Sequence, residues 1–264
     1  MEIAASIVIY KTDLNEVLHV IKCFLAHESS VTMHVIDNSP IDNLSHHLSF
    51  DDRIKYKHFP NNPGYGTAHN YGIQQSINYG IPYHIVLNTD LSFNKECIND
   101  LLKFMELNQN VGLVMPKIIY PDGSLQYLVR NNPTPYLLFA RRFFKNSKKA
   151  PRENRIYQNM DKDYNQAMYH IPFISGCFMF FRTEVLKQSG LFDEKIFMYT
   201  EDADLSRRVL QHSETAYWPK AVAIHNFKGG VHKNLKLTWY GLKSAFYYFN
   251  KWGWNNKIKD EIRG

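Results

Sequence analysis

The sequence predicts an α/β fold, in which helices flank a mostly parallel central sheet and a helical segment is appended at the C-terminus. Strand-like and helix-like hydrophobic patterns alternate through the first third of the chain. With 264 residues, 44% of them hydrophobic, the chain is long enough to fill one sizeable core. No internal repeat or low-complexity linker interrupts it. We therefore expect one domain over residues 1–230 and an amphipathic helical segment over residues 231–264.

The N-terminal part begins with a strand and an amphipathic helix. The run Ser6–Tyr10 is almost entirely apolar, as expected of a strand that is covered on both faces. Thr12 or Asp13 can cap the helix that follows, because leucine, isoleucine and valine recur there at helical spacing. A second strand is predicted over Val31–Ser39.

The alternation continues to about residue 120. We expect a helix over Ala68–Tyr79, a strand over Tyr83–Asp90, a helix capped by Asn94 and a strand over Gly112–Tyr120. Units of strand, helix and strand form parallel sheets, because the helix returns the chain to the edge from which it started. The prediction of a mostly parallel sheet rests on this part of the chain.

Regular patterns weaken in the middle of the chain and then return. Residues 130–169 are basic and polar, and their densest positive cluster is Arg141–Arg155. This cluster fits either a solvent-exposed loop or a contact with substrate or membrane. The apolar run Phe173–Arg182, a helix around Thr183–Gln188 and a strand over Ala216–His225 follow.

The C-terminal segment is predicted to form an amphipathic helix. One face carries Trp239, Leu242, Ala245, Phe246 and Phe249, and its borders carry Lys236, Lys243 and Lys251. This combination fits a peripheral contact with a membrane surface. It fits the protein's own packing or a dimer face equally well.

The composition limits the cellular compartment and the binding partners that we expect for this protein. The net charge of +6 suits an anionic partner, but the basic residues are scattered and no nucleic-acid recognition motif is present, so we expect no nucleic-acid binding. Cys23, Cys97 and Cys177 are widely spaced, which is typical of reduced thiols in a reducing compartment. The N-terminus lacks a signal-peptide pattern, and the longest apolar run, Ile171–Phe181, is too short to span a bilayer. We expect a cytoplasmic protein.

Polar side chains follow the predicted strands at their carboxyl ends, where open parallel sheets bind ligands. Asp37 and Asn38 follow one strand, Asn88 and Asp90 end another, and His225 ends a third. Each has a structural alternative, because such residues also form turns and caps. Together they offer one carboxylate for a base or ribose and another for a metal, with His225 as either a structural residue or a ligand beside Asp90.

The segment FPNNPGYGTAHNYGI, Phe59–Ile73, leads into a predicted helix. It contains Gly64 and Asn70 but neither the GxGxxG nor the GxxxxGK[ST] fingerprint. Phosphate binding by glycine backbone is therefore only weakly indicated. A bend that allows close approach of the backbone is the alternative.

An acidic cluster lies in the segment TEDADLSRR. Glu201, Asp202 and Asp204 fall within four residues, and such crowding raises the pKa of at least one carboxyl and favours a general base or a cation site. The alternative is an exposed acidic first turn that complements the helix dipole. Arg207 and Arg208 follow one turn later and could neutralise the cluster or reach a diphosphate.

In this order, these segments resemble glycosyltransferase family 2 with the GT-A fold, in particular bacterial rhamnosyltransferases of O-antigen and cell-surface polysaccharide biosynthesis. The resemblance is carried by SIVIYK, VIDNS, NPGYGTAHNYGI, VLNTD, ISGCFMFFRTEVLKQSGLFDEKIFMYTEDADLSRRV and AIH. It implies a Rossmann-like sheet and a set of site residues. The set assigns catalysis to Asp202 and Glu201, donor-nucleotide binding to Tyr10, Asp37, Asn38, Gly64, Asn70, Asn88 and Arg207, and metal binding to Asp90 and His225.

The resemblance also implies a reaction. Asp202 would remove the proton of the acceptor hydroxyl as it attacks the anomeric carbon, with inversion, and Mg²⁺ or Mn²⁺ would neutralise the departing diphosphate. The first aspartate of the family's DXD motif is Asn88 here, so Asp90 is the one charged ligand in that motif. We expect a nucleotide-sugar donor, dTDP-L-rhamnose, and a lipid-linked glycan acceptor at the cytoplasmic face of the inner membrane. The absence of a QxxRW motif favours addition of one sugar per encounter.

Three alternatives remain at this point. The first is a transferase of the same family that uses a UDP-sugar. The second is a sugar-phosphate nucleotidyltransferase, although YKTDLNEV after the first strand is not the glycine-rich, basic loop that such enzymes need. The third is a non-catalytic nucleotide-sugar-binding protein, which the replacement at Asn88 favours.

Overall fold

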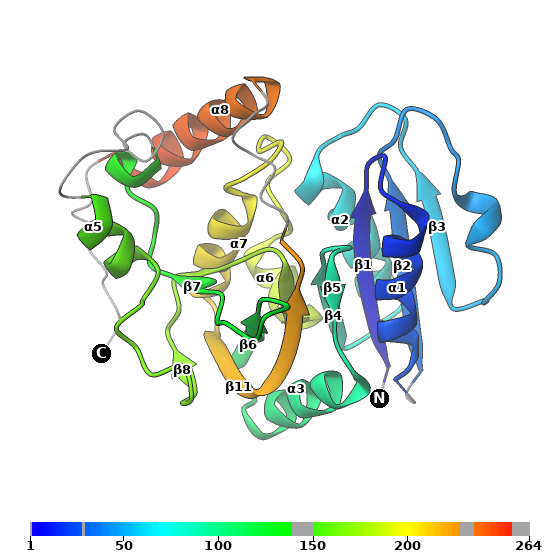
Figure 1. Cartoon of the computed structure of the whole chain (residues 1–264), viewed down its shortest axis with the longest axis horizontal. Helices are drawn as coiled ribbons and strands as arrows, with labels where there is room; N and C mark the ends of the chain where they lie inside the picture. Colours follow the sequence, from blue (N-terminus) through cyan, green and yellow to red (C-terminus); the bar gives the residue numbers. More distant parts are fainter. Residues whose placement is uncertain (1, 28–29, 139–149, 228–234, 255–264) are drawn as a thin grey trace.

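The computed structural model describes residues 2–27, 30–138, 150–227 and 235–254 (Figure 1). Most of the basic cluster predicted over residues 141–155 lies outside the described residues. So do residues 231–234 and 255–264 of the C-terminal segment.

The central sheet has the order β3-β2-β1-β4-β10-β6-β11-β5, with β8 paired to β11. Its strands are β1 (Ile3–Ile9), β2 (Val31–Asp37), β3 (Ile54–His58), β4 (Tyr83–Leu87), β5 (Leu91–Ser92), β6 (Val111–Ile119), β8 (Met168–Tyr169), β10 (Phe178–Arg182) and β11 (Glu214–His225). Most paired residues lie in the parallel pairs β1 with β2, β1 with β4, β2 with β3 and β6 with β11. The predicted α/β class with a mostly parallel sheet is confirmed.

Helices flank this sheet, and Figure 1 shows α3 and α8 at opposite edges of the molecule. They are α1 (Leu14–Leu25), α2 (Tyr65–Asn78), α3 (Lys95–Leu107), α5 (Ala150–Tyr157), α6 (Thr183–Ser189), α7 (Glu201–Val209) and α8 (Leu235–Trp252). The predicted caps form, since Asp13 accepts from Asn15 N and Asn94 accepts from Cys97 N. The stretch without regular patterns contains α5 and β8. A small second sheet pairs β7 (Val129–Arg130), at its start, with β9 (Phe173–Ile174), in the apolar run that follows it.

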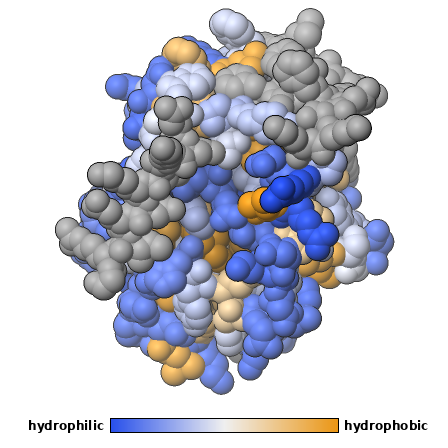
Figure 2. Space-filling view, turned by 90° about the vertical axis from the view of Figure 1, so that its left-hand side faces the viewer, coloured by the Kyte–Doolittle hydropathy of each residue, from blue (hydrophilic) through white to orange (hydrophobic). Residues whose placement is uncertain are grey.

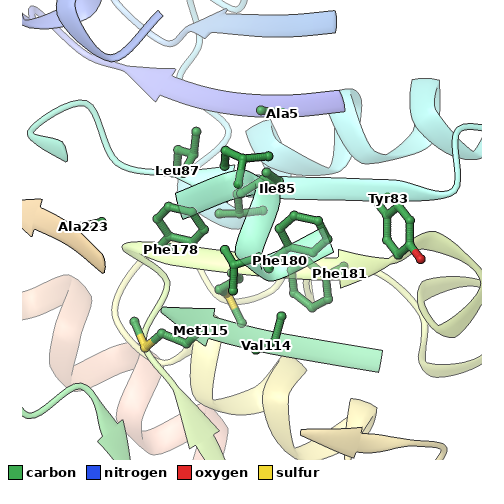
Figure 3. Packing of buried hydrophobic residues seen from close by; sticks show 14 of the residues in the cluster. Ala5, Tyr83, Ile85, Leu87, Val114, Met115, Phe178, Phe180, Phe181 and Ala223 are labelled. Atoms are coloured by element: carbon green, nitrogen blue, oxygen red, sulfur yellow. The ribbon is translucent and has the colours of Figure 1, made fainter. Parts of the chain in front are cut away.

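The core is built around β10, which runs antiparallel between β4 and β6. Its aromatic side chains are completely buried, as the apolar run in the sequence indicates. Figure 3 shows β10 between β4 and β6, with the labelled side chains Phe178, Phe180, Phe181, Ile85, Leu87, Val114 and Met115. This insertion fixes the spacing between the two parallel parts of the sheet, and therefore between the loops at their ends.

The C-terminal helix α8 packs against α7 through one face and exposes another. Tyr248 and Phe249 are 1% exposed, whereas Trp239 is 66% and Phe246 57% exposed. The predicted apolar face is therefore divided between packing and solvent. Figure 2 shows the side of the molecule that carries α5, where hydrophilic residues predominate and hydrophobic ones are scattered. Within the described ranges, none of the helices is long and apolar enough to cross a membrane.

Candidate active site

A cavity of about 410 Å³ lies beside the carboxyl ends of β1 and β2. Its lining includes Lys11, Asp37, Ile41 and Leu44. Tyr10, the residue after β1, is 49% exposed, and the Lys11 ammonium lies 5.6 Å from the centre of its ring. Cationic, anionic and apolar groups therefore meet in one hollow at the sheet edge where polar residues were predicted to gather.

Asp37 is held rigidly in this cavity. Its Oδ1 accepts the backbone N–H of Ser39 at 2.7 Å and its Oδ2 accepts the Tyr56 hydroxyl at 2.9 Å. Burial and the bond to Asp37 raise the pKa of Tyr56, so its hydroxyl stays a donor. Each carboxylate oxygen keeps a second acceptor position. Asp37 is buried, so it is a fixed acceptor in the wall of the cavity.

Asn38 and Gly64 connect the end of β2 to the glycine segment. The Asn38 amide donates to Asn62 Oδ1 at 3.2 Å and to the Gly64 carbonyl at 3.3 Å. Gly64 has φ 106° and ψ 170°, and a Cβ there would lie 2.7 Å from the Phe197 carbonyl oxygen. The backbone at Gly64 is closely approached by the chain around Phe197. Contact of Gly64 or Asn38 with a donor nucleotide stays a prediction.

Asn70 of α2 holds the loop that precedes α7. Its side chain donates to the Phe192 carbonyl and accepts the Phe192 N–H, both at 2.9 Å. The contact is tight, because a Cβ on Gly66 would lie 2.8 Å from Phe192 Cβ. Both ends of the Asn70 amide are thus used within the protein. Its predicted contact with the donor is not tested by this geometry.

Tyr65 joins the end of β4 to the segment before β10, and sequence reasoning missed it. Its hydroxyl lies 2.9 Å from Asn88 Oδ1 and 3.0 Å from the Gly176 carbonyl oxygen. Burial and the surrounding carboxylates, Glu201 foremost, raise the pKa of Tyr65. The hydroxyl therefore keeps its proton, which it shares between Asn88 Oδ1 and the Gly176 carbonyl. Only the place of Tyr65 in the segment Phe59–Ile73, between Gly64 and Gly66, marks it in the sequence, because the helix was predicted to begin at Ala68.

Asp90, in the turn between β4 and β5, lies beside His225, the last residue of β11. Asp90 Oδ1 lies 3.0 Å from His225 Nε2, since β11 pairs with β5 and places His225 opposite Leu91. A carboxylate oxygen and an imidazole nitrogen are suitable ligands for a divalent cation. No group of three or more His, Cys, Asp or Glu side chains suited to a metal occurs in the described parts of the chain. The pair fits a cation that takes its remaining ligands from a bound diphosphate and water.

The two acidic residues that open α7 have different environments. Asp202 is half-buried, and its oxygens accept the N–H groups of Gly176 and Ala203, both at 2.9 Å. Glu201 is 5% exposed, and its Oε2 has no hydrogen-bond partner among the described residues. Burial and then the Asp202 carboxylate raise the pKa of Glu201 to about 8. Glu201 is therefore the member of the pair that takes up a proton first as the pH falls.

Arg130 of β7 is a second residue that sequence reasoning missed. Its guanidinium carbon lies 5.7 Å and 5.4 Å from the ring centres of Tyr157 and Phe173. Burial raises the pKa of Asp202, and the Gly176 N–H and the charge of Arg130 oppose that rise. The positive charge of Arg130 thus favours the ionised form of Asp202.

Asp204, the third acidic residue of the cluster, has a structural role. Asp204 is completely buried and accepts from Arg208 Nε at 2.9 Å and from Trp252 Nε1 at 2.7 Å. The Arg207 guanidinium lies 4.2 Å from the centre of the Trp252 ring. Arg208 thus neutralises Asp204, as one of the alternatives held, and Arg207 contacts α8. Contact of Arg207 with a donor diphosphate stays a prediction.

Comparison with known protein families and curated proteins finds a matching family and similar proteins. A profile of the family described as Glycosyl transferase family 2 matches residues 7–190. The chain is 28% identical over 201 residues to the low-salt glycan biosynthesis hexosyltransferase Agl10 of Haloferax volcanii, which covers 73% of this chain and 58% of that protein. It is 27% identical over 219 residues to an N-acetylglucosaminyl-diphospho-decaprenol L-rhamnosyltransferase of Mycobacterium tuberculosis, which covers 76% of this chain and 68% of that protein. The match therefore spans little more than half of the first relative.

Solved structures share the fold at low sequence identity. S. aureus TarS 1-349 in complex with UDP-GlcNAc is 15% identical with a TM-score of 0.56, and the match covers 88% of this chain and 60% of that one. GalNAc-T7 with UDP, GalNAc and Mn²⁺ is 13% identical with a TM-score of 0.60, over 85% of this chain and 44% of that one. At this identity the likeness shows the fold alone, and the predicted GT-A fold is confirmed.

Proposed function

Because this chain belongs to glycosyltransferase family 2, we propose that it transfers a single sugar from a nucleotide-sugar donor to a lipid-linked glycan, with inversion at the anomeric carbon. The proposed donor is dTDP-L-rhamnose. The name of the mycobacterial relative specifies both an L-rhamnosyl group and a diphospho-decaprenol acceptor, which supports this choice. A UDP-sugar is the alternative donor, supported by the similar fold of TarS in complex with UDP-GlcNAc.

The observation that carries the proposal is the contrast between Glu201 and Asp202. A general base must be ionised and reachable, and Asp202 combines partial exposure with two backbone N–H donors and the charge of Arg130. Asp202 would take the proton of the acceptor hydroxyl as that oxygen attacks. Glu201, in its protonated form, would donate a hydrogen bond from its buried carboxyl to the bound sugar.

The donor would lie along the edge of the sheet. We assign the base and ribose to the cavity beside Tyr10, Asp37 and Asn38, because that hollow combines a fixed acceptor with apolar walls. Asn88 would contact the diphosphate from the end of β4. Gly64 and Asn70 would act by holding the loop before α7 against α2, and Arg207 would supply positive charge near the same helix.

Asp90 and His225 would hold Mg²⁺ or Mn²⁺ against the diphosphate. Bound there, the cation would neutralise the charge that develops on the leaving nucleoside diphosphate. The fold shared with GalNAc-T7, solved with UDP and Mn²⁺, supports this assignment. Asn88 is neutral, so Asp90 would carry the charge of the motif alone.

We further propose that the enzyme works in the cytoplasm at the inner face of the membrane. A lipid-linked acceptor resides at that surface. The exposed side chains of Trp239, Lys243 and Phe246 on α8 combine aromatic and basic character, which suits a peripheral contact with anionic lipid.

Donor protection in a thermal shift assay, with Mg²⁺, Mn²⁺ or EDTA, tests the donor and the cation together. dTDP-L-rhamnose should raise the melting temperature more than UDP-sugars do, and EDTA should abolish the shift. Asp90→Ala should remove the cation-dependent part, whereas Asp202→Asn should keep the shift and lower turnover by roughly 10²–10⁴-fold. The exposed Glu96→Gln on α3 is the control.

Two results would contradict the proposal. Equal turnover in Asp202→Asn and wild type would remove the assignment of the base. Donor protection in wild type without transfer to any lipid-linked acceptor would support a non-catalytic nucleotide-sugar-binding protein instead.

A further inference from the structure

Gln126 makes a two-point contact with His225 that the proposed chemistry does not yet use. Its side-chain Nε2 donates to the His225 carbonyl at 2.8 Å, and its Oε1 lies 2.9 Å from His225 Nδ1. Gln126 is only 5% exposed. A turn after β6 delivers it, since Tyr120 N bonds Ser124 O and Gln126 N bonds Ile118 O. The two residues are 99 positions apart in sequence, and the Gln126 amide contacts the His225 ring with one end and the His225 backbone with the other.

This contact determines which ring nitrogen of His225 carries a proton. A backbone carbonyl can only accept, so the NH₂ end of the Gln126 amide must face it. The oxygen end then faces Nδ1, and an oxygen there requires a proton on Nδ1. In the neutral ring, Nε2 therefore presents a lone pair. That lone pair lies 3.0 Å from Asp90 Oδ1, which is also an acceptor.

Two acceptors at 3.0 Å repel each other when nothing lies between them, whereas both can bind the same divalent cation. We propose that Gln126 is a positioning residue that fixes His225 in the Nδ1–H tautomer and holds its ring, so that Nε2 and Asp90 converge on one divalent cation. This inference rests on the proposed function of Asp90 and His225. Partners of this kind, hydrogen-bonded to a metal-binding histidine, typically change metal affinity by about 10–100-fold.

The competing explanation is mechanical. Through its bond to the His225 carbonyl, Gln126 could serve only to fasten the turn of residues 120–124 to the end of β11. Two variants separate the explanations. Gln126→Glu keeps an oxygen opposite Nδ1 and loses the donor to the carbonyl, whereas Gln126→Met loses both. If only fastening matters, the two variants should behave alike.

The first measurement is Mn²⁺ affinity, followed by the electron paramagnetic resonance of free Mn²⁺, with dTDP or UDP present. We expect Gln126→Met to bind Mn²⁺ about 10–100-fold more weakly than wild type and Gln126→Glu to stay within about threefold. Circular dichroism confirms that each variant is folded. Wild-type affinity in Gln126→Met, or equal losses in both variants, would overturn the inference.

The second measurement needs no metal. The ¹⁵N NMR spectrum of protein labelled with ¹⁵N in its histidine rings reports the ring tautomer. The His225→Asn variant identifies the signals of His225, because it lacks them. We expect the Nδ1–H form in wild type and in Gln126→Glu, and loss of that preference in Gln126→Met. An Nε2–H ring in the wild type would overturn the inference. If His225→Asn binds Mn²⁺ as wild type does, the metal assignment fails, whichever tautomer is found.

Discussion

Asp202 Oδ2 accepts a hydrogen bond from the backbone N–H of Gly176 at 2.9 Å. This bond holds the Asp202 carboxylate, in the first turn of α7, against the segment that leads into β10. It also favours the ionised form of Asp202. Burial has the opposite effect and raises the pKa of Asp202 above its usual value, while Arg130 opposes that rise. A base must be ionised to act, so kcat should fall as the pH is lowered through this raised pKa.

The first prediction concerns Arg130. Arg130→Met removes a positive charge that stabilises ionised Asp202, so the pKa of Asp202 rises further and the acidic limb of the kcat profile moves to higher pH. Arg130→Lys keeps the charge and should leave the limb near that of wild type. The groups facing Asp202 also include Glu201, which stays in place in both variants. Identical limbs in the methionine variant and wild type would refute the role of Arg130.

The second prediction tests the steric effect of the close contact between Gly64 and Phe197. An alanine there must adopt φ 106° and ψ 170°, a region that only glycine occupies readily, and its Cβ would meet the Phe197 carbonyl at 2.7 Å. We expect Gly64→Ala to lower the free energy of unfolding by about 3 kcal/mol or more. Gly80 has φ 68° and nothing within 4 Å, so Gly80→Ala should cost only about 1–2 kcal/mol. Urea unfolding of both variants measures the difference, and equal losses would contradict the steric explanation.

Most elements of the N-terminal half could be predicted from sequence because their determinants are local, but β3 (Ile54–His58) was not predicted. Hydrophobic spacing and the caps Asp13 and Asn94 lie within the elements that they define. The position of Asp37 and Asp90 at one sheet edge follows from the parallel topology. The start of α2 was predicted at Ala68, but the helix begins at Tyr65. Gly64 and Tyr65 contact Phe197, which is distant in sequence, so no local pattern marks this start.

The remaining parts of the site depend on long-range contacts or on helix geometry. Gln126 and Arg130 follow the last strand predicted in the N-terminal half, and their partners come from distant strands and helices. The acidic cluster was treated as one unit, but residues two apart on a helix point about 200° apart. Asp202 therefore reaches Gly176, while Asp204 reaches α8.

The third prediction concerns the attachment of α8. Lys251 Nζ lies 2.7 Å from Asp193 Oδ2 and 2.8 Å from Asp204 Oδ1, so it bridges the loop before α7 and α7 itself. Lys251→Met leaves buried Asp204 with fewer donors and should cost about 1–3 kcal/mol of unfolding free energy. Lys243→Met, on an exposed part of the same helix, should change it by less than about 0.5 kcal/mol. Equal urea midpoints for the two variants would show that the bridge contributes nothing.

The fourth prediction concerns three buried histidines, His34 of β2, His69 of α2 and His84 of β4. Ser6 Oγ lies 2.7 Å from His69 Nδ1 and 2.8 Å from His84 Nε2. Burial lowers the pKa of His69 to about 3 and, with the charge of Lys55, that of His34 to about 4, while His84 lies well below its usual value. These rings are neutral in the folded protein at pH values where the unfolded chain binds protons.

The sign of the effect follows from that difference. Above about pH 6.5, neither state binds protons at these rings, so they cause no pH dependence. Below it, each ring costs about 1.4 kcal/mol of stability per pH unit until its folded pKa is reached. The free energy of unfolding should therefore fall steeply between about pH 6 and pH 4, by up to about 4 kcal/mol per unit for three rings.

His34 provides the sharpest test, because neither of its ring nitrogens has a hydrogen-bond partner among the described residues. His34→Leu removes one proton-binding site of the unfolded chain and leaves no polar group unpaired. We expect a nearly unchanged free energy of unfolding at pH 7.5 and a gain over wild type of about 2 kcal/mol at pH 5. His46→Leu, at an exposed position, should show no such gain. Urea unfolding at both pH values measures this, and parallel pH dependences in wild type and His34→Leu would refute the linkage.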